Sequence, residues 1–169
     1  MKTFNRFCYG ISSKISKNEH VFMIDFDGIS FKRVISELLH IQFDNQLSDI
    51  YVIRSTNGYN AICLDKLTLN MIYNIGINSK IADQDFFKYG FKREYFVLRF
   101  DKDKELICTL KSNSDKYEKS FAHYNFLNMS FGIEKQLDFT FDSNTVIDII
   151  QYPSNKNGYH YVKEVVIND

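Results

Sequence analysis

The chain has 169 residues, 44% of them hydrophobic, which is enough for one domain with a substantial core. Its 21 basic and 21 acidic residues balance, so any affinity for a polyanion must come from a local basic surface. Its three cysteines, Cys8, Cys63 and Cys108, are widely spaced without a Cys-x-x-Cys motif, so the sequence indicates neither a disulfide framework nor a zinc knuckle.

The first predicted element is a strand within "FMIDFDGIS", residues 22–30, which ends on two acids and a glycine. Residues two apart on a strand point to the same face, so Asp25 and Asp27 should lie side by side, with Phe26 turned into the core. Two carboxylates this close repel each other, and a divalent cation such as Mg²⁺ or Mn²⁺ would relieve the repulsion. The alternative is a strand end that runs into an Asp-Gly turn, with both acids solvated.

A helix, a loop and a strand are predicted next. Apolar residues recur at mostly helical spacing over residues 30–40. Residues 44–49, "DNQLSD", read as a loop. The run "IYVIRS", residues 50–55, is typical of a strand. These elements form a first β–α unit.

A hairpin and a second helix follow. Asn57-Gly58 is a strong hairpin turn, and an ordinary type I′ hairpin explains it without any function. The returning strand covers residues 61–64. Asp65 is the predicted N-cap of a helix that ends near Gly76.

The second half of the chain is richer in strands. A short helix is predicted over residues 83–91, strands over 95–100 and 106–111, and a terminal hairpin over 145–167 that turns at Asn157-Gly158. Residues 121–131 fit either type of element. No linker or low-complexity tract interrupts the chain. We therefore predict one α+β domain, residues 1–169, with a mixed or antiparallel sheet and flanking helices.

Three stretches in order, "IDFDG", "IRSTNGYN" and "FVLRFDKDK", resemble the core of archaeo-eukaryotic-type primase-polymerases, especially the small plasmid and virus forms. The resemblance spans roughly residues 21–111. In that family an Asp-x-Asp pair on a strand binds two divalent ions. A Ser/Gly-rich hairpin that ends in histidine contacts the nucleotide phosphates, and a third carboxylate and a basic residue on later strands complete the site.

The resemblance assigns roles to particular residues. It implies that Asp25 and Asp27 are catalytic metal ligands, with Asp101 or, alternatively, Asp103 as the third acid. It also implies contacts with substrate from the hairpin and from the later strand. The residues expected to make them are Ser55, Asn57, Gly58, Asn60, Arg99, Lys102 and Lys104.

The activity implied is two-metal nucleotidyl transfer that makes or extends DNA or RNA primers during replication of a mobile element or virus. The cofactor would be Mg²⁺ or Mn²⁺. The partners would be nucleoside triphosphates, a single-stranded template and a protein that supplies helicase activity. Because the N-terminus lacks a signal-peptide pattern and no run approaches the roughly 20 apolar residues of a membrane span, we expect no membrane association and a cytoplasmic location, in the host cell if the protein is viral.

Asn60 departs from the family pattern, because it stands where the family carries histidine. An amide can donate a hydrogen bond to a phosphate, but it cannot carry a positive charge or shuttle a proton. A catalytically weak or inactive nucleic-acid-binding domain of the same fold is therefore one alternative.

A second alternative comes from "FMIDFDG", which is also similar to the nucleophile motif of haloacid-dehalogenase-type phosphatases. In that case Asp25 would be the nucleophile and Asp27 the general acid. Two features count against this alternative. Ile29 replaces the usual Thr, and the later Gly-Asp-x-x-x-Asp motif is missing from the sequence.

Overall fold

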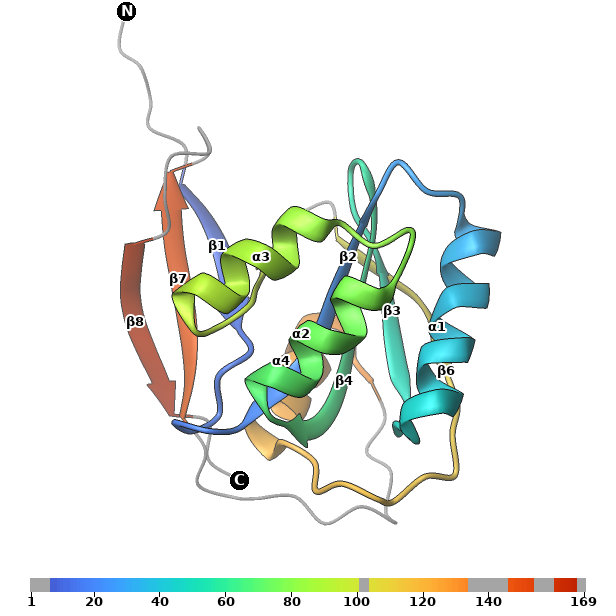
Figure 1. Cartoon of the computed structure of the whole chain (residues 1–169). Coiled ribbons are helices and arrows are strands. Elements are labelled where there is room, and N and C mark those ends of the chain that lie inside the picture. The colour runs from blue at the N-terminus through green and yellow to red at the C-terminus, as the bar shows by residue number, and fades with distance from the viewer. Residues whose placement is uncertain (1–6, 101–103, 134–145, 154–159, 167–169) are drawn as a thin grey trace, which may run out of the picture.

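Two four-stranded sheets, with helices packed around them, make up the computed structural model, which describes residues 7–100, 104–133, 146–153 and 160–166 (Figure 1). All strand pairings within the two sheets are antiparallel. The α+β class with antiparallel strands that the sequence predicts is thus confirmed.

The sheet that carries the acid pair is built around a β–α–β–β–α succession. Its strand order is β2 (His20–Asp27), β4 (Gly58–Leu67), β3 (Ile50–Arg54) and β6 (Glu105–Leu110). β2 and β3 are both antiparallel to β4, so they run parallel to each other with β4 between them. α1 (Phe31–Asn45) connects them, which makes a split β–α–β unit.

The second sheet joins segments that are far apart in the sequence. Its order is β5 (Val97–Phe100), β1 (Phe7–Ser12), β7 (Val146–Pro153) and β8 (His160–Val166). Strand β1 is not among the elements predicted from the sequence. The strands predicted over 95–100 and 106–111 exist as β5 and β6 but separate into different sheets. The predicted terminal hairpin is present as β7 and β8, and its turn at Asn157-Gly158 lies outside the described residues.

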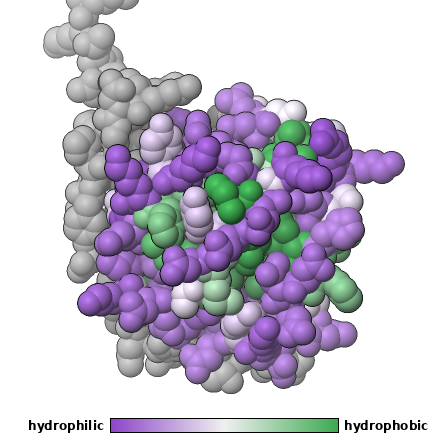
Figure 2. All heavy atoms as spheres, in the orientation of Figure 1, coloured by the Kyte–Doolittle hydropathy of each residue, from purple (hydrophilic) through white to green (hydrophobic). Residues whose placement is uncertain are grey.

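Three further helices complete the fold: α2 (Leu69–Asn78), α3 (Gln84–Arg93) and α4 (Phe121–Phe131). Figure 1 shows α2 and α3 in front of β2, with α4 behind, and Figure 2 shows hydrophobic residues only in small separate groups on the facing surface. α4, ambiguous in the sequence, begins at an N-cap: Ser120 Oγ accepts a hydrogen bond from the His123 backbone N–H. Among the described residues, every helix falls short of the length and apolarity needed to cross a bilayer.

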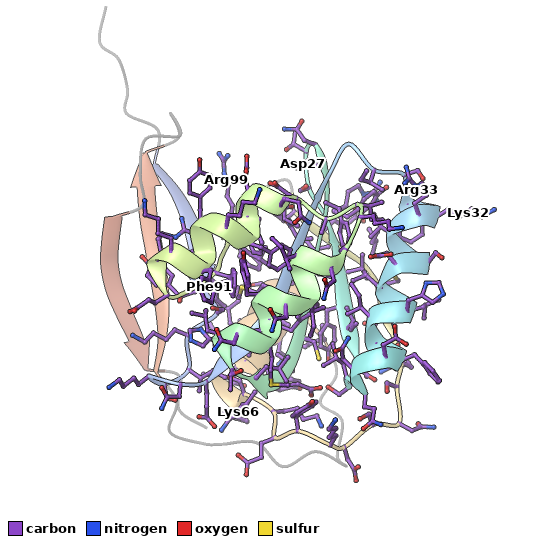
Figure 3. All side chains as sticks on the ribbon, viewed as in Figure 1. Asp27, Lys32, Arg33, Lys66, Phe91 and Arg99 are labelled. Carbon is purple, nitrogen blue, oxygen red and sulfur yellow. The ribbon has the colours of Figure 1, made fainter. Side chains whose placement is uncertain are left out.

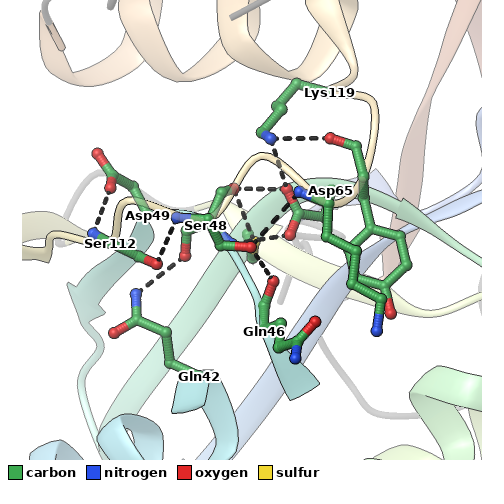
Figure 4. Close-up of polar contacts among 11 residues, drawn as sticks. Gln42, Gln46, Ser48, Asp49, Asp65, Ser112 and Lys119 are labelled. Carbon is green, nitrogen blue, oxygen red and sulfur yellow. Dashed lines mark hydrogen bonds and ion pairs between the residues drawn. The ribbon is translucent and has the colours of Figure 1, made fainter. Parts of the chain in front are cut away.

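The prediction of Asp65 as a helix N-cap is wrong, because Asp65 lies inside β4 and is fully buried. Thr68 caps α2 instead, with its hydroxyl oxygen accepting from Met71 N–H. The Asp65 carboxylate accepts bonds from Ser48 Oγ at 2.5 Å and Ser48 N–H at 2.8 Å, and lies 3.6 Å from Lys119 Nζ (Figure 4). Asp65 therefore joins β4 to two segments, the loop that precedes β3 and the segment that precedes α4.

Two buried histidines lie where β1, β2 and α4 meet. His20 Nδ1 is 3.0 Å from Ser13 Oγ, and His123 Nε2 donates to the Ser12 carbonyl at 2.8 Å. Burial lowers the pKa of each imidazole to about 4. The positive charge of Lys14 lowers the pKa of His20 further. For His123, the bond to the Ser12 carbonyl acts in the opposite direction, whereas the charge of His20 again lowers the pKa. Both rings are therefore neutral in the folded protein at pH 7.

We expect the two histidines to destabilise the fold as the pH falls below 6.5, because each binds a proton more tightly in the unfolded chain. The loss should be about 2 kcal/mol for each histidine between pH 7 and pH 5. Urea unfolding of the parent and of His123→Gln at both pH values checks this. The variant should show the smaller pH dependence, whatever its absolute stability, and an equal dependence in both proteins would contradict the assignment.

Candidate metal centre

The acid pair lies at the end of β2, where the strand leaves the core. Phe26 is fully buried, whereas Asp25 before it is partly exposed and Asp27 after it is exposed. The alternation expected of a strand therefore places the two carboxylates on one face, as the sequence predicts. Gly28 follows with φ of +67°, a left-handed conformation that lets the chain turn toward α1.

A third carboxylate, Asp83, joins this pair from the connection between α2 and α3. The Asp83 backbone N–H donates to the Asp25 carbonyl at 2.8 Å, which attaches the start of α3 to the edge of β2. One carboxylate oxygen from each of Asp25, Asp27 and Asp83 lies within 4.8 Å of the other two. Asp83 is not among the site residues that the sequence predicts.

Local hydrogen bonds hold Asp83 in place. It is the N-cap of α3, and its Oδ1 accepts from the Asp85 N–H at 2.9 Å. The next side chain, Gln84, donates to the carbonyls of Gly76 at 3.1 Å and Ser79 at 3.0 Å. These bonds join the end of α2 to the start of α3, so the carboxylate of Asp83 has a defined position.

Asn60 supports Asp25 from the neighbouring strand. The two residues are directly paired between β2 and β4, and Asn60 is only 5% exposed. Its Nδ2 donates to Asp25 Oδ1, and its Oδ1 accepts from Lys104 Nζ. Asn60, predicted as a substrate contact, thus uses both ends of its amide within the protein to link Lys104 to Asp25.

The electrostatic environment raises the pKa of Asp25 to about 7. Burial is the largest cause, followed by repulsion from Asp27, and Asp83 adds to the repulsion. Lys104 acts in the opposite direction. Burial and the two neighbouring acids thus disfavour ionisation of Asp25, and a bound cation would relieve this.

The hairpin between β3 and β4 packs against the end of β2. Ser55 N–H donates to the Gly58 carbonyl at 2.9 Å, and Gly28 N–H donates to the Asn57 carbonyl at 2.9 Å. Neither Asn57 nor Gly58 has a positive φ, so the turn is not type I′. A Cβ at Gly58 would lie 1.9 Å from the Phe26 carbonyl oxygen, so glycine is required here for close backbone contact beside the acids.

Of the basic residues predicted to contact substrate, two can be placed. Lys104 is partly buried behind Asn60, and Arg99 is exposed on β5, on the opposite face from Phe100, which packs against Phe126 of α4. Figure 3 shows Arg99 and Asp27 toward the same end of the molecule. The predicted residues Asp101, Lys102 and Asp103 lie outside the described residues.

The donor set fits a hard divalent cation. Carboxylate oxygens are the ligands that Mg²⁺ and Mn²⁺ prefer, and three of them converge here from two chain segments. Asp83 brings one oxygen already bonded to Asp85 N–H. The geometry of the three carboxylates is therefore compatible with a bound divalent cation.

We expect Asp25→Asn to stabilise the metal-free protein at pH 8. The raised pKa means that ionising Asp25 destabilises the fold as the pH rises from 3.8 through 7, and asparagine keeps the oxygen that accepts from Asn60. Allowing for partial exposure, the gain should be about 2 kcal/mol at pH 8 and absent at pH 4. Thermal unfolding in chelator at both pH values measures it, and a less stable variant at pH 8 would contradict this assignment.

Comparison of the chain with protein-family models, with curated proteins and with solved structures gave no significant match. The function must therefore be inferred from the site itself. Its defining features are three convergent carboxylates, a buried amide behind one of them and a lysine behind the amide.

Proposed function

We propose that the chain is a metal-dependent nucleotidyltransferase of the primase-polymerase type, which makes or extends DNA or RNA primers in the replication of a mobile element or virus. The observation that carries the proposal is the convergence of Asp83 with Asp25 and Asp27, which supplies a third acid beside the Asp-x-Asp pair. The three motifs that resemble the family support it. Mg²⁺ or Mn²⁺ is the proposed cofactor.

In this function the three carboxylates would hold the cation, with Asp25 oriented by Asn60. A bound divalent cation would lower the pKa of the attacking 3′-hydroxyl and neutralise charge on the triphosphate. Lys104 places a positive charge behind Asp25. Arg99 is the proposed contact for the triphosphate, because its guanidinium can bind phosphate oxygens in a bidentate way.

The antiparallel sheet bears on the phosphatase alternative. That alternative depends on a parallel sheet with the nucleophile at a strand end, whereas β2 is antiparallel to its neighbour β4 along its length. The alternative of an inactive nucleic-acid-binding domain shares the proposed fold. The inactive domain would bind nucleic acid without transferring nucleotides, so only a measurement of activity can distinguish it from the proposed nucleotidyltransferase.

The test is primer extension and de novo synthesis with manganese, beside binding of a single-stranded oligonucleotide. We expect the parent to incorporate nucleotides and Asp25→Asn with Asp27→Asn to lose incorporation while still binding the oligonucleotide. The double variant controls for binding through basic residues alone. Binding without incorporation by the parent would leave a binding domain, and the absence of both would reject the proposal.

Calorimetric titration with manganese is the second arm of the same test. The parent should bind the metal and the double variant should not. Metal at about 100 times its dissociation constant should stabilise the parent by about 2.7 kcal/mol and leave the double variant unchanged. Equal binding by both proteins would remove the acids from the proposed site.

A further inference from the structure

A row of directly paired residues crosses the acid-bearing sheet from Asp25. Asp25 on β2 is paired with Asn60 on β4, and Asn60 is paired with Ile53 on β3, so the three side chains lie on one face. Ile53 is paired in turn with Leu106 on β6. Lys104 comes two residues before Leu106 and therefore belongs to the same face. Its side chain reaches across β3 and donates to Asn60 Oδ1.

The amide of Asn60 can satisfy its two neighbours in one direction only. Its oxygen accepts hydrogen bonds and its NH₂ group donates them, whereas the ammonium of Lys104 can only donate and an ionised Asp25 can only accept. Oδ1 must therefore face Lys104 and Nδ2 must face Asp25, which is the direction in the structure. Because Asn60 is only 5% exposed, the reverse direction would place its oxygen against the carboxylate with little water between them.

We infer that Lys104 is a positioning residue for the metal site. It fixes the direction of the Asn60 amide, and the bond from Asn60 Nδ2 to Asp25 Oδ1 then fixes the rotation of the carboxylate. That rotation decides where both oxygens of Asp25 lie relative to the other two acids of the cluster. The inference rests on the proposed function and deepens it, because Lys104 then acts on the metal through Asn60 and is not the substrate contact expected from the resemblance.

A role through the amide differs from a role of charge alone. A charge acts on the site through its electrostatic field, so its loss should have the same effect whichever neutral side chain replaces the lysine. Glutamine and methionine are both uncharged, but only glutamine has an NH₂ group that can donate to Asn60 Oδ1. Lys104→Gln and Lys104→Met are therefore a matched pair, and Lys104→Arg keeps both the charge and a donor.

Calorimetric titration with manganese alone is the first test. Lys104→Arg should bind the metal as tightly as the parent. Lys104→Met should bind it about tenfold more weakly, at the lower end of the cost of losing a partner behind a metal ligand, and Lys104→Gln should lie between the two. Lys80→Met is the control for a lost charge, because Lys80 is an exposed base three residues before Asp83, and it should bind as the parent does. Equal affinities in Lys104→Gln and Lys104→Met would overturn the inference.

The second test asks whether Lys104 acts through Asn60. Asn60→Leu removes the amide and should itself weaken manganese binding by about 10–100-fold. Adding Lys104→Met to Asn60→Leu should cause no further loss, because the amide that Lys104 directs is then absent. Circular dichroism of each variant checks that the chains are folded. Losses that simply add in the double variant would show that Lys104 acts independently of the amide, contrary to the inference.

Nuclear magnetic resonance without metal reports on the amide itself. The side-chain NH₂ signals of Asn60 are assigned by their absence from Asn60→Leu. In the parent, one of these protons should exchange slowly with solvent, because the group is buried and bonded to Asp25. The protection should fall in Lys104→Met and persist in Lys104→Arg. Equal protection in the parent and in Lys104→Met would contradict the inference.

Manganese binding by the parent separates this inference from the proposed function. If the parent binds manganese and Lys104→Met binds it equally well, the inference alone fails. If manganese binding responds to these changes as described but the parent incorporates no nucleotide, the proposed function alone fails. A parent that binds no manganese would reject both.

Discussion

Asp83→Asn should lower manganese-dependent nucleotide incorporation by at least about 100-fold without destabilising the protein. The carboxylate lies within 4.8 Å of the oxygens of Asp25 and Asp27, so its charge should be part of the metal site. Loss of a metal ligand should cost more than the 10–100-fold that follows loss of a partner behind a ligand. Asparagine is as good an N-cap as aspartate, so α3 should keep its capping bond from Asp85.

Asp85→Asn is the matched control, because Asp85 is an exposed acid in the first turn of the same helix and is not part of the cluster. It should leave incorporation and manganese affinity unchanged. Asp101→Asn and Asp103→Asn, measured in parallel, decide which acid is third. If Asp101→Asn loses incorporation and Asp83→Asn retains it, the third acid is Asp101, as the resemblance implies, and not Asp83.

Asp65→Asn should destabilise the fold by about 3–5 kcal/mol, because it leaves Lys119 buried without an opposite charge. Lys119 is 3% exposed, and its Nζ lies 3.6 Å from Asp65 Oδ1 and donates to the Tyr117 carbonyl at 2.8 Å. Burial raises the pKa of Asp65, while the bonds from Ser48 and the charge of Lys119 oppose that rise. Guanidinium chloride unfolding measures the effect.

A double-mutant cycle separates the ion pair from the loss of each side chain. Asp65→Asn with Lys119→Met should be more stable than the sum of the single changes predicts, by about 1–3 kcal/mol, because the double variant buries no unpaired charge. The exposed pair Arg54–Glu105, at 2.9 Å, is the control, and its cycle should give less than about 1 kcal/mol. Additive effects at Asp65 and Lys119 would contradict the assignment.

Local patterns predict the elements whose side chains alternate or repeat along the chain itself. The alternation of apolar and acidic residues before Asp27 predicts a strand with Asp25 and Asp27 on one face. The helix and the hairpin that follow are found at the positions that their sequence patterns predict. The sequence predicts that this helix ends at residue 40, five residues too early, because α1 continues to Asn45. The αL conformation that ends it belongs to Gln46, a residue that rarely marks a C-cap in sequence.

Features that depend on distant partners were not predictable in this way. Asp83 reads as an ordinary helix cap, and only the backbone bond to Asp25 brings it to the site. Asp65 also has the sequence context of a helix cap, but its partner Lys119 comes from a distant part of the chain. Strand β1 has partners in β5 and β7, far along the sequence, so its neighbours in sequence give no sign of either.

The position of β1 has a consequence for the order in which the protein assembles during synthesis. The sheet that carries the acids is complete within residues 20–110, whereas β1 needs β5 on one edge and β7 on the other. A chain that leaves the ribosome from its N-terminus can therefore close the acid-bearing sheet before β7 exists. Pairing over such long separations is slow to nucleate. The first strand to be made is thus expected to be among the last to gain neighbours on both edges.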